Sequence, residues 1–132
     1  MQKTYVCVAG VVQFGSKVLL LKRTSTRRAS ADKWQPPSGF IKEKEAVEDA
    51  VLREVKEETG LDGEIIGVGN FFEAVDEWGK WVTMPFLISV KSDNVVIDQK
   101  EHSEAIWIEP KDVLNFDLVE GSRGDFEALG LL

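Results

Sequence analysis

The spacing of apolar residues near the N-terminus predicts two antiparallel strands followed by an irregular segment. Residues 4–14 are rich in β-branched and aromatic side chains, and residues 17–22 continue this pattern after a Gly15-Ser16 turn, as expected for a hairpin. The polar and basic residues 24–33 show no such pattern and predict a loop. Residues 34–39 contain two successive prolines, which exclude a helix and favour an extended backbone.

One amphipathic helix is predicted over residues 45–59, where apolar positions recur at spacings of one, three and four. They form a stripe along one side of the helix: Ala46, Val47, Ala50, Val51 and Val55. Gly60 is placed to take the left-handed conformation that ends a helix, and Leu61 is the apolar residue expected after it.

The remainder of the chain alternates between short strands and short helices. Residues 64–75 and 81–90 resemble strands around a turn at residues 76–80, and residues 105–109 predict a further short strand in which Trp107 is a core side chain. Short helices are expected at residues 111–115, after Pro110, and at residues 125–131. Strands on both sides of one long helix indicate a mixed α/β sandwich.

The composition is that of one globular domain. The chain has 132 residues, 43% of them apolar and 30% charged, and no linker divides it, so we expect a single domain over residues 1–132. Cys7 is the only cysteine, which excludes an internal disulfide and favours a small core side chain in a reducing compartment. Because no apolar run approaches the roughly 18–20 residues of a membrane span, and no signal peptide is apparent, we expect a cytoplasmic protein without membrane contact.

The charges are unevenly distributed. A net charge of −7 disfavours general binding to nucleic acid, whose phosphates are also negative. Residues 17–33 nevertheless hold six basic residues against one acidic residue, whereas residues 43–58 are dense in carboxylates. A basic arm beside an acidic helix suits an anionic ligand that binds together with a divalent cation; the alternative is two solvated surface segments.

The polar face of the predicted helix carries the candidate chemistry. Glu54, Glu57 and Glu58 stand at i, i+3 and i+4, so their carboxylates project from one patch, where like charges repel. A hard divalent cation such as Mg²⁺ would relieve that repulsion. Arg53 can reach Glu57 one turn later. The alternative is a solvated acidic face.

The residues around this patch complete a longer pattern. The pattern extends over residues 39–61, and its fixed positions are Gly39, Glu45, Arg53, Glu54, Val55, Glu57, Glu58, Gly60 and Leu61. Because of this pattern, the chain is identified as a member of the Nudix hydrolase family, with the family's box over residues 39–61. The resemblance implies an α/β/α sandwich with a mixed β-sheet and a loop–helix–loop box. It also implies a pyrophosphohydrolase that cleaves a nucleoside diphosphate linked to another group.

The resemblance further implies roles for the box residues. Glu54, Glu57, Glu58 and the backbone carbonyl of Ser38 would bind Mg²⁺, with Mn²⁺ as an alternative. Structural roles would fall to the other box positions: Arg53 and Glu45 would orient the carboxylates, Gly39 would allow the loop geometry and Gly60 would end the helix. Many relatives have Gly-Gly where this chain has Ser38-Gly39, a departure that removes no type of ligand.

The general base has several candidates. Either a box glutamate, Glu54 or Glu57, accepts the proton, or a carboxylate before the strand of Trp107 does so. In that segment we prefer Glu101 to Glu104 because Glu101 lies six residues before Trp107, the spacing of family members with a loop base. The neighbouring His102 is expected to be a solvated loop residue.

Substrate selection is less clearly marked. Arg23 and Arg27 are candidates for phosphate contacts, and Trp34, Phe40 and Trp78 for stacking on a base, although each could instead be a surface or packing residue. We expect a nucleoside triphosphate or oxidised nucleotide, cleaved to monophosphate and pyrophosphate. The alternatives are an ADP-ribose or nucleotide-sugar pyrophosphatase and a non-catalytic nucleotide-sensing module. A homodimer is possible, and RNA decapping is disfavoured by the net charge.

Overall fold

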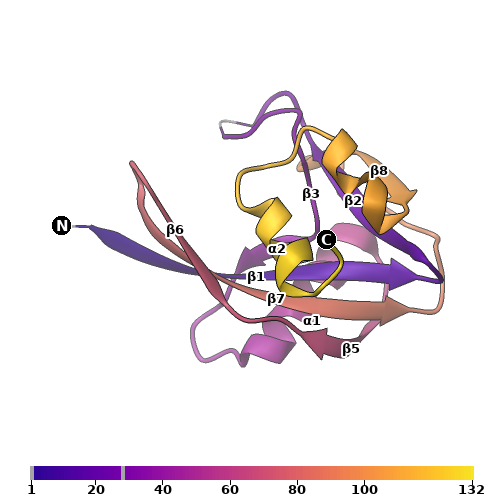
Figure 1. The fold of residues 1–132 in the computed structure, drawn as a ribbon, viewed down its shortest axis with the longest axis horizontal. Coiled ribbons are helices and arrows are strands. Elements are labelled where there is room, and N and C mark those ends of the chain that lie inside the picture. Colours follow the sequence, from indigo (N-terminus) through magenta and orange to yellow (C-terminus); the bar gives the residue numbers. More distant parts are fainter. Residues whose placement is uncertain (1, 28) are drawn as a thin grey trace.

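A computed structural model describes residues 2–27 and 29–132 (Figure 1). Strands are more extensive than helices in the described chain, and they belong to one mixed sheet. In chain order the elements are β1 (Lys3–Phe14), β2 (Lys17–Arg23), β3 (Trp34–Gln35), β4 (Ser38–Phe40), α1 (Val47–Thr59), β5 (Gly63–Val68), β6 (Phe72–Asp76), β7 (Gly79–Val90), β8 (His102–Ile108), η1 (Pro110–Asn115) and α2 (Ser122–Ala128).

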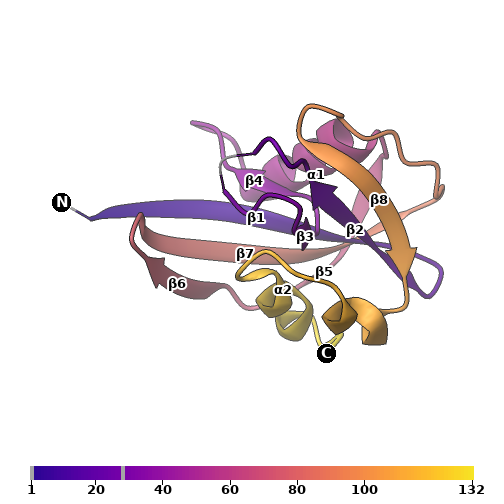
Figure 2. The ribbon, with the colours of Figure 1, turned by 90° about the horizontal axis from the view of Figure 1, so that it is seen from above.

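The long strands β1 and β7 form the middle of the sheet. They pair in parallel, whereas the other pairings in the sheet are antiparallel. The main strand order is β3-β2-β1-β7-β5, with β4 paired to β1, β6 to β7 and β8 to β2. Figure 2 shows α1 on one side of the central strands, and η1 and α2 on the other. This layering is the expected α/β/α sandwich.

Two apolar clusters fill the spaces between these layers. One joins the buried face of α1, with Ala50, Val51 and Val55, to alternate residues of β1 such as Val8. The other lies beneath η1 and α2 and includes Val11 from the opposite face of β1. Because side chains alternate along a strand, β1 supplies apolar residues to both clusters, so both of its faces are buried.

Several predicted boundaries differ from the structure. The helix α1 begins at Val47, two residues later than expected, and ends as predicted: Gly60 has a φ of 75° and its N–H donates to the Lys56 carbonyl at 2.9 Å. The last helix begins at Ser122, after Gly121, whose φ is 92°. Sequence periodicity does not reveal this earlier start, since the first turn of α2 contains no apolar stripe.

The predicted strand over residues 64–75 is instead two strands. β5 pairs with the C-terminal half of β7, and β6 pairs with its N-terminal half. The break falls opposite Pro85, which has no N–H to donate; its carbonyl accepts from the Gly69 N–H at 2.9 Å. The interruption therefore comes from a residue of the partner strand, which the sequence of residues 64–75 does not show.

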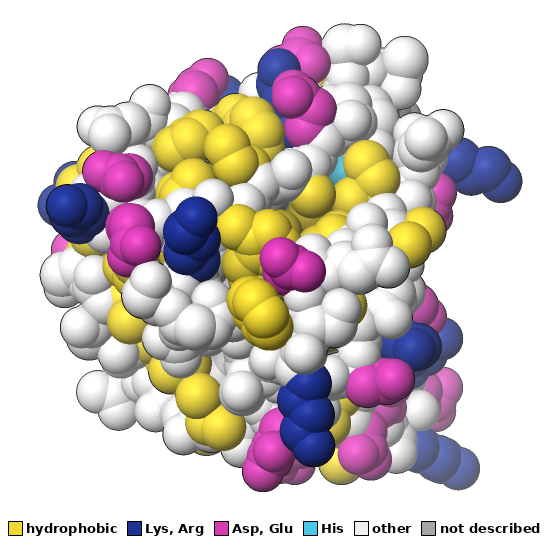
Figure 3. Space-filling model, turned by 90° about the vertical axis from the view of Figure 1, so that its right-hand side faces the viewer, with side chains coloured by type: hydrophobic (Ala, Val, Ile, Leu, Met, Phe, Trp, Pro, Cys, Tyr) yellow, Lys and Arg dark blue, Asp and Glu magenta, His cyan; other side chains and the backbone are white. Residues whose placement is uncertain are grey.

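Charged side chains of both signs are interspersed on the outside. On the face drawn in Figure 3, hydrophobic side chains occupy the middle and acidic and basic groups surround them. Among the described residues, no helix is both long and apolar enough to cross a membrane.

Candidate active site

The three box glutamates lie on the C-terminal half of α1, but their surroundings differ. Glu54 and Glu58 point toward the sheet and have 14% and 5% of their side-chain surface exposed. Glu57 keeps 54% of its side-chain surface exposed. The patch predicted from the helix spacing is thus present, with Glu58 buried, Glu54 partly buried and Glu57 open to solvent.

Arg53 joins this patch to the segments that precede the helix. Its Nε and Nη2 donate to the two oxygens of Glu45 at 2.8 and 3.0 Å, and Nη2 also donates to the Phe40 carbonyl at 3.0 Å. Nη1 donates to Glu54 at 2.8 Å and to Glu57 at 3.2 Å. The hydrogen bonds from Arg53 lower the pKa of Glu45 to about 2. Because a planar guanidinium has five donors in fixed directions, it can hold this many acceptors at once.

Gly39 lets Glu54 reach its position. A Cβ at residue 39 would overlap the Glu54 carboxyl group. The backbone of Gly39 is not in the left-handed region, so the requirement for glycine is the close approach of the carboxylate rather than an unusual φ. β4 places Gly39 opposite Val8 of β1, which holds this segment against the helix.

Glu58 is the most buried of the three carboxylates. Its Oε2 accepts the Ser38 backbone N–H at 3.0 Å. Burial, and then repulsion from Glu54 and Glu101, raise the pKa of Glu58 well above its usual range, although the Ser38 hydrogen bond opposes this. Burial also raises the pKa of Glu54. Two neighbouring carboxylates whose ionisation is disfavoured, one buried and one partly buried, are suited to bind a cation, which supplies the missing positive charge.

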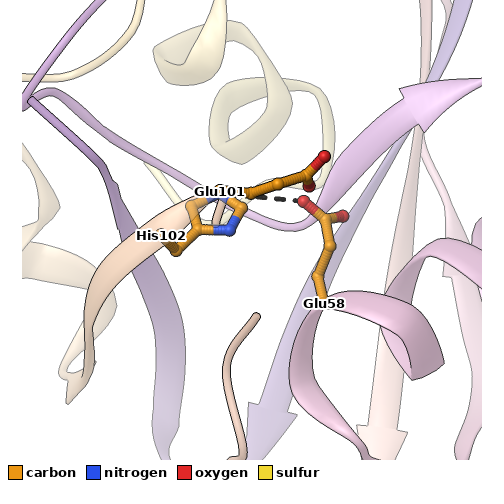
Figure 4. Close-up of side chains that lie close together, drawn as sticks. All are labelled: Glu58, Glu101 and His102. Carbon is orange, nitrogen blue, oxygen red and sulfur yellow. Dashed lines mark ion pairs between the residues drawn. The ribbon is translucent and has the colours of Figure 1, made fainter. Parts of the chain in front are cut away.

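Glu101 and His102 approach this cluster from the start of β8. Each of Glu58, Glu101 and His102 offers a ligand atom within 4.8 Å of the other two. Figure 4 shows these three side chains close together. The prediction that His102 is a solvated loop residue is wrong: its side chain is fully buried. β8 starts three residues earlier than predicted and pairs His102 with Arg23 of β2, a long-range contact that local periodicity does not reveal.

The other candidate for the loop base lies elsewhere. Glu104 forms an ion pair with Lys22 at 3.4 Å, and 59% of its side-chain surface is exposed. The structure thus brings Glu101, and not Glu104, into the group with Glu58 and His102.

The two predicted phosphate-binding arginines lie beside the cluster. The Arg23 Nη1 donates to Gln35 Oε1 at 3.4 Å, and Gln35 in turn contacts His102. The Arg27 Nη1 donates to the Glu101 carbonyl at 3.5 Å. Arg28, which belongs to the same basic stretch of sequence, lies outside the described residues.

The three predicted stacking residues fall in three different places. Phe40 lies next to Tyr5 and Trp81, with ring centroids 6.0 Å from each. Trp34 packs edge-on against Phe116 and belongs to the border of the cluster beneath η1 and α2. Trp78 lies at the turn between β6 and β7 and is 67% exposed. Of the three, only Phe40 lies within the box over residues 39–61.

Asp125 of α2 is a buried polar residue that sequence reasoning missed. Its Oδ1 has no hydrogen-bond partner among the described residues, and burial raises its pKa to about 8. Burial, and then the charge of Asp125, raise the pKa of Cys7 to about 11. Cys7 is half-buried rather than part of the core. Aspartate is common near helix starts, so the sequence contains no signal for this burial.

Comparison with known proteins agrees with this geometry. The NUDIX domain matches residues 1–128. The nucleoside triphosphatase NudI of Escherichia fergusonii is 28% identical and the alignment covers 99% of both chains. The ADP-ribose pyrophosphatase of Methanocaldococcus jannaschii is 32% identical over 64% of this chain and 50% of that protein.

Other relatives are longer than this chain. The chain spans 25% and 36% of the length of Nudix hydrolases 8 and 5 of Arabidopsis thaliana. Among solved structures, a MutT protein from Methanosarcina mazei superposes with a TM-score of 0.85 at 26% identity, over 98% of this chain and 94% of that one. The domain match, the layered fold and the carboxylates on α1 lead to one conclusion: the chain belongs to the Nudix family.

Proposed function

We propose that this chain hydrolyses the diphosphate linkage of a small nucleotide in a reaction that depends on a divalent cation. The substrate we favour is a nucleoside triphosphate or an oxidised form of one, cleaved to a nucleoside monophosphate and pyrophosphate. The single observation that carries this proposal is the set of carboxylates on the C-terminal half of α1, Glu54, Glu57 and Glu58, with Glu101 placed beside Glu58 at the start of β8. Residues 1–132 would form the single domain that does this.

The donor set fits a hard divalent cation. Carboxylate oxygens are the protein ligands that Mg²⁺ and Mn²⁺ prefer, and the raised pKa values of Glu54 and Glu58 indicate a site that is short of positive charge. In this proposal Glu54, Glu57, Glu58 and the Ser38 carbonyl hold Mg²⁺, with Mn²⁺ as the alternative. When bound, the cation would offset the negative charge of the phosphate oxygens, which otherwise repel an attacking hydroxide.

We assign proton transfer, positioning of the glutamates and substrate binding to the residues around the cation. Glu101 accepts a proton from the attacking water; a P–O bond forms to that water oxygen, and the P–O bond to the leaving pyrophosphate breaks. Arg53 and Glu45 hold the glutamates in place, and Arg23 and Arg27 contact phosphate oxygens. Phe40 stacks on the base, with Trp34 and Trp78 as further candidates.

The relatives support this substrate class and one alternative. NudI of Escherichia fergusonii is a nucleoside triphosphatase by name and aligns with 99% of this chain. The Methanocaldococcus jannaschii relative is named an ADP-ribose pyrophosphatase, so ADP-ribose or a nucleotide sugar is the second candidate. The box retains each carboxylate, which favours an enzyme over a nucleotide-sensing module.

A hydrolysis panel tests the proposal. The purified chain is incubated with Mg²⁺ or Mn²⁺ and with standard and oxidised nucleoside triphosphates, ADP-ribose, diadenosine polyphosphates and nucleotide sugars, and the products are separated by chromatography. We expect monophosphate and pyrophosphate from a triphosphate. Cleavage of ADP-ribose alone would favour the second candidate, and nucleotide binding without turnover would favour the sensing module.

Three substitutions assign the roles. We expect Glu57→Gln and Glu58→Gln to abolish turnover with an unchanged circular dichroism spectrum. Glu101→Gln should lower the rate at least about tenfold, since a general base typically contributes about 10²–10⁴-fold, with little loss of Mg²⁺ affinity. Glu104→Gln is the matched control because Glu104 lies near Glu101 in sequence but pairs with Lys22. An unaltered rate in Glu101→Gln would return the base role to a box glutamate.

A further inference from the structure

His102 faces the carboxylate cluster with a nitrogen atom. Its Nε2 lies 3.7 Å from Glu58 Oε1, and the ring is fully buried (Figure 4). It is the only histidine in the chain, and the family box does not include its position. A nitrogen donor beside two carboxylates makes a different ligand set from the all-oxygen set described above.

The hydrogen bonds around His102 indicate which ring nitrogen carries the proton. Arg23 can only donate, so the Gln35 oxygen faces Arg23 and accepts its N–H at 3.4 Å. The Gln35 amide nitrogen then faces His102 Nε2 at 3.1 Å and must donate to it. With Gln35 in this orientation Nε2 holds an electron pair and the proton resides on Nδ1, which has no hydrogen-bond partner among the described residues. An unprotonated imidazole nitrogen is the form that binds metal ions.

The distance between Nε2 and Glu58 Oε1 fits this role. Both atoms are electron-pair donors, so no hydrogen bond joins them unless one becomes protonated. With bonds of about 2.1 Å to a shared ion, two neighbouring ligand atoms lie roughly 3.0–3.6 Å apart. The observed 3.7 Å is close to that range, and Glu101 completes a set of three donors within 4.8 Å.

We propose that His102 Nε2, with Glu58 and Glu101, is a ligand of a divalent transition ion such as Zn²⁺ or Co²⁺, which this site prefers to Mg²⁺. Imidazole nitrogen favours such ions, whereas Mg²⁺ favours oxygen ligands and water. The cation and the Gln35 N–H compete for one electron pair, so Gln35 turns aside when the ion binds. One oxygen of Glu101 binds the ion and the other stays available to accept a proton.

The single histidine makes a direct test practical. The chain is prepared without an affinity tag and labelled with ¹⁵N only in histidine, so both ring-nitrogen signals belong to His102. We expect the spectrum without added metal to show the Nδ1–H tautomer. Addition of Zn²⁺ should shift the Nε2 signal strongly, whereas Mg²⁺ should leave it nearly unchanged. Binding of Zn²⁺ with no change at Nε2 would overturn the inference.

Calorimetry with a substituted chain provides the second measurement. We expect His102→Gln to weaken Zn²⁺ binding at least tenfold and to leave Mg²⁺ binding within about twofold, with Glu104→Gln as the control. Equal weakening of both ions, with circular dichroism unchanged, would indicate a structural role and overturn the inference. If His102→Gln fails to fold, the ¹⁵N spectrum of the unsubstituted chain still tests the ligand directly, because it requires no substitution.

The inference rests on the proposed cation-dependent reaction, but the two can fail separately. Hydrolysis with Mg²⁺ and no Zn²⁺ effect on His102 would leave the proposed function intact and remove this ligand. No binding of any of these ions and no hydrolysis would remove both.

Discussion

We expect Asp125 to make this protein less stable as the pH rises. Burial raises its pKa from 3.8 to about 8, and its Oδ1 has no partner among the described residues. Between these two values the folded chain keeps a proton on Asp125 that the unfolded chain has released. The folded state then binds more protons than the unfolded state, so the free energy of unfolding falls as pH rises.

The size of this effect follows from the two pKa values. A tenfold change in proton affinity is worth about 1.4 kcal/mol, so a carboxyl whose pKa moves from 3.8 to about 8 costs up to roughly 6 kcal/mol of stability above pH 8. Below pH 4 the cost disappears because both states are protonated. That range is large beside the roughly 5–15 kcal/mol that stabilises an ordinary domain.

Asp125→Asn removes the titration and keeps the shape of the side chain. We expect the free energy of unfolding of the variant, relative to the original chain, to increase by about 3 kcal/mol between pH 5 and pH 7. Urea unfolding followed by tryptophan fluorescence at several pH values measures this difference. Glu127→Gln is the control, because Glu127 lies on the same helix with half of its side chain exposed, near Arg123. A difference that stays constant from pH 5 to pH 8 would show that Asp125 ionises normally and would refute the reasoning.

Three further substitutions test residues that position the glutamates of the candidate site or end the helix that carries them. Arg53→Lys keeps the charge but loses the fork that holds Glu45 and Glu54, so we expect kcat to fall at least about tenfold; a rate within twofold would contradict the positioning role. Gly39→Ala places a methyl group against the Glu54 carboxyl, and calorimetry should show weaker Mn²⁺ binding while circular dichroism is retained. Gly60→Ala forces a side chain into the left-handed region at a φ of 75°, and urea unfolding should reveal a loss of roughly 1–2 kcal/mol, with no loss if another backbone conformation can end the helix.

The chain's amphipathic helix and the register of its carboxylates could be predicted from the sequence alone. The apolar stripe and Gly60 depend on residues three or four positions apart, so they need no information from the rest of the chain. The same local spacing places Glu54, Glu57 and Glu58 on one patch. The hairpin of β1 and β2 and the mixed α/β class follow from equally local patterns.

The tertiary structure decided which polar residues are buried and which of them meet. His102 is buried because β8 pairs with β2, far from it in sequence, and Asp125 because α2 packs on β1 and β7. Likewise, the pairing of β4 with β1 brings Gly39 beneath Glu54. The surroundings of a side chain are made by segments distant in sequence, and a pKa depends on those surroundings. For that physical reason the sequence predicted where the carboxylates would stand on α1, and only the fold determined that a buried imidazole would face one of them.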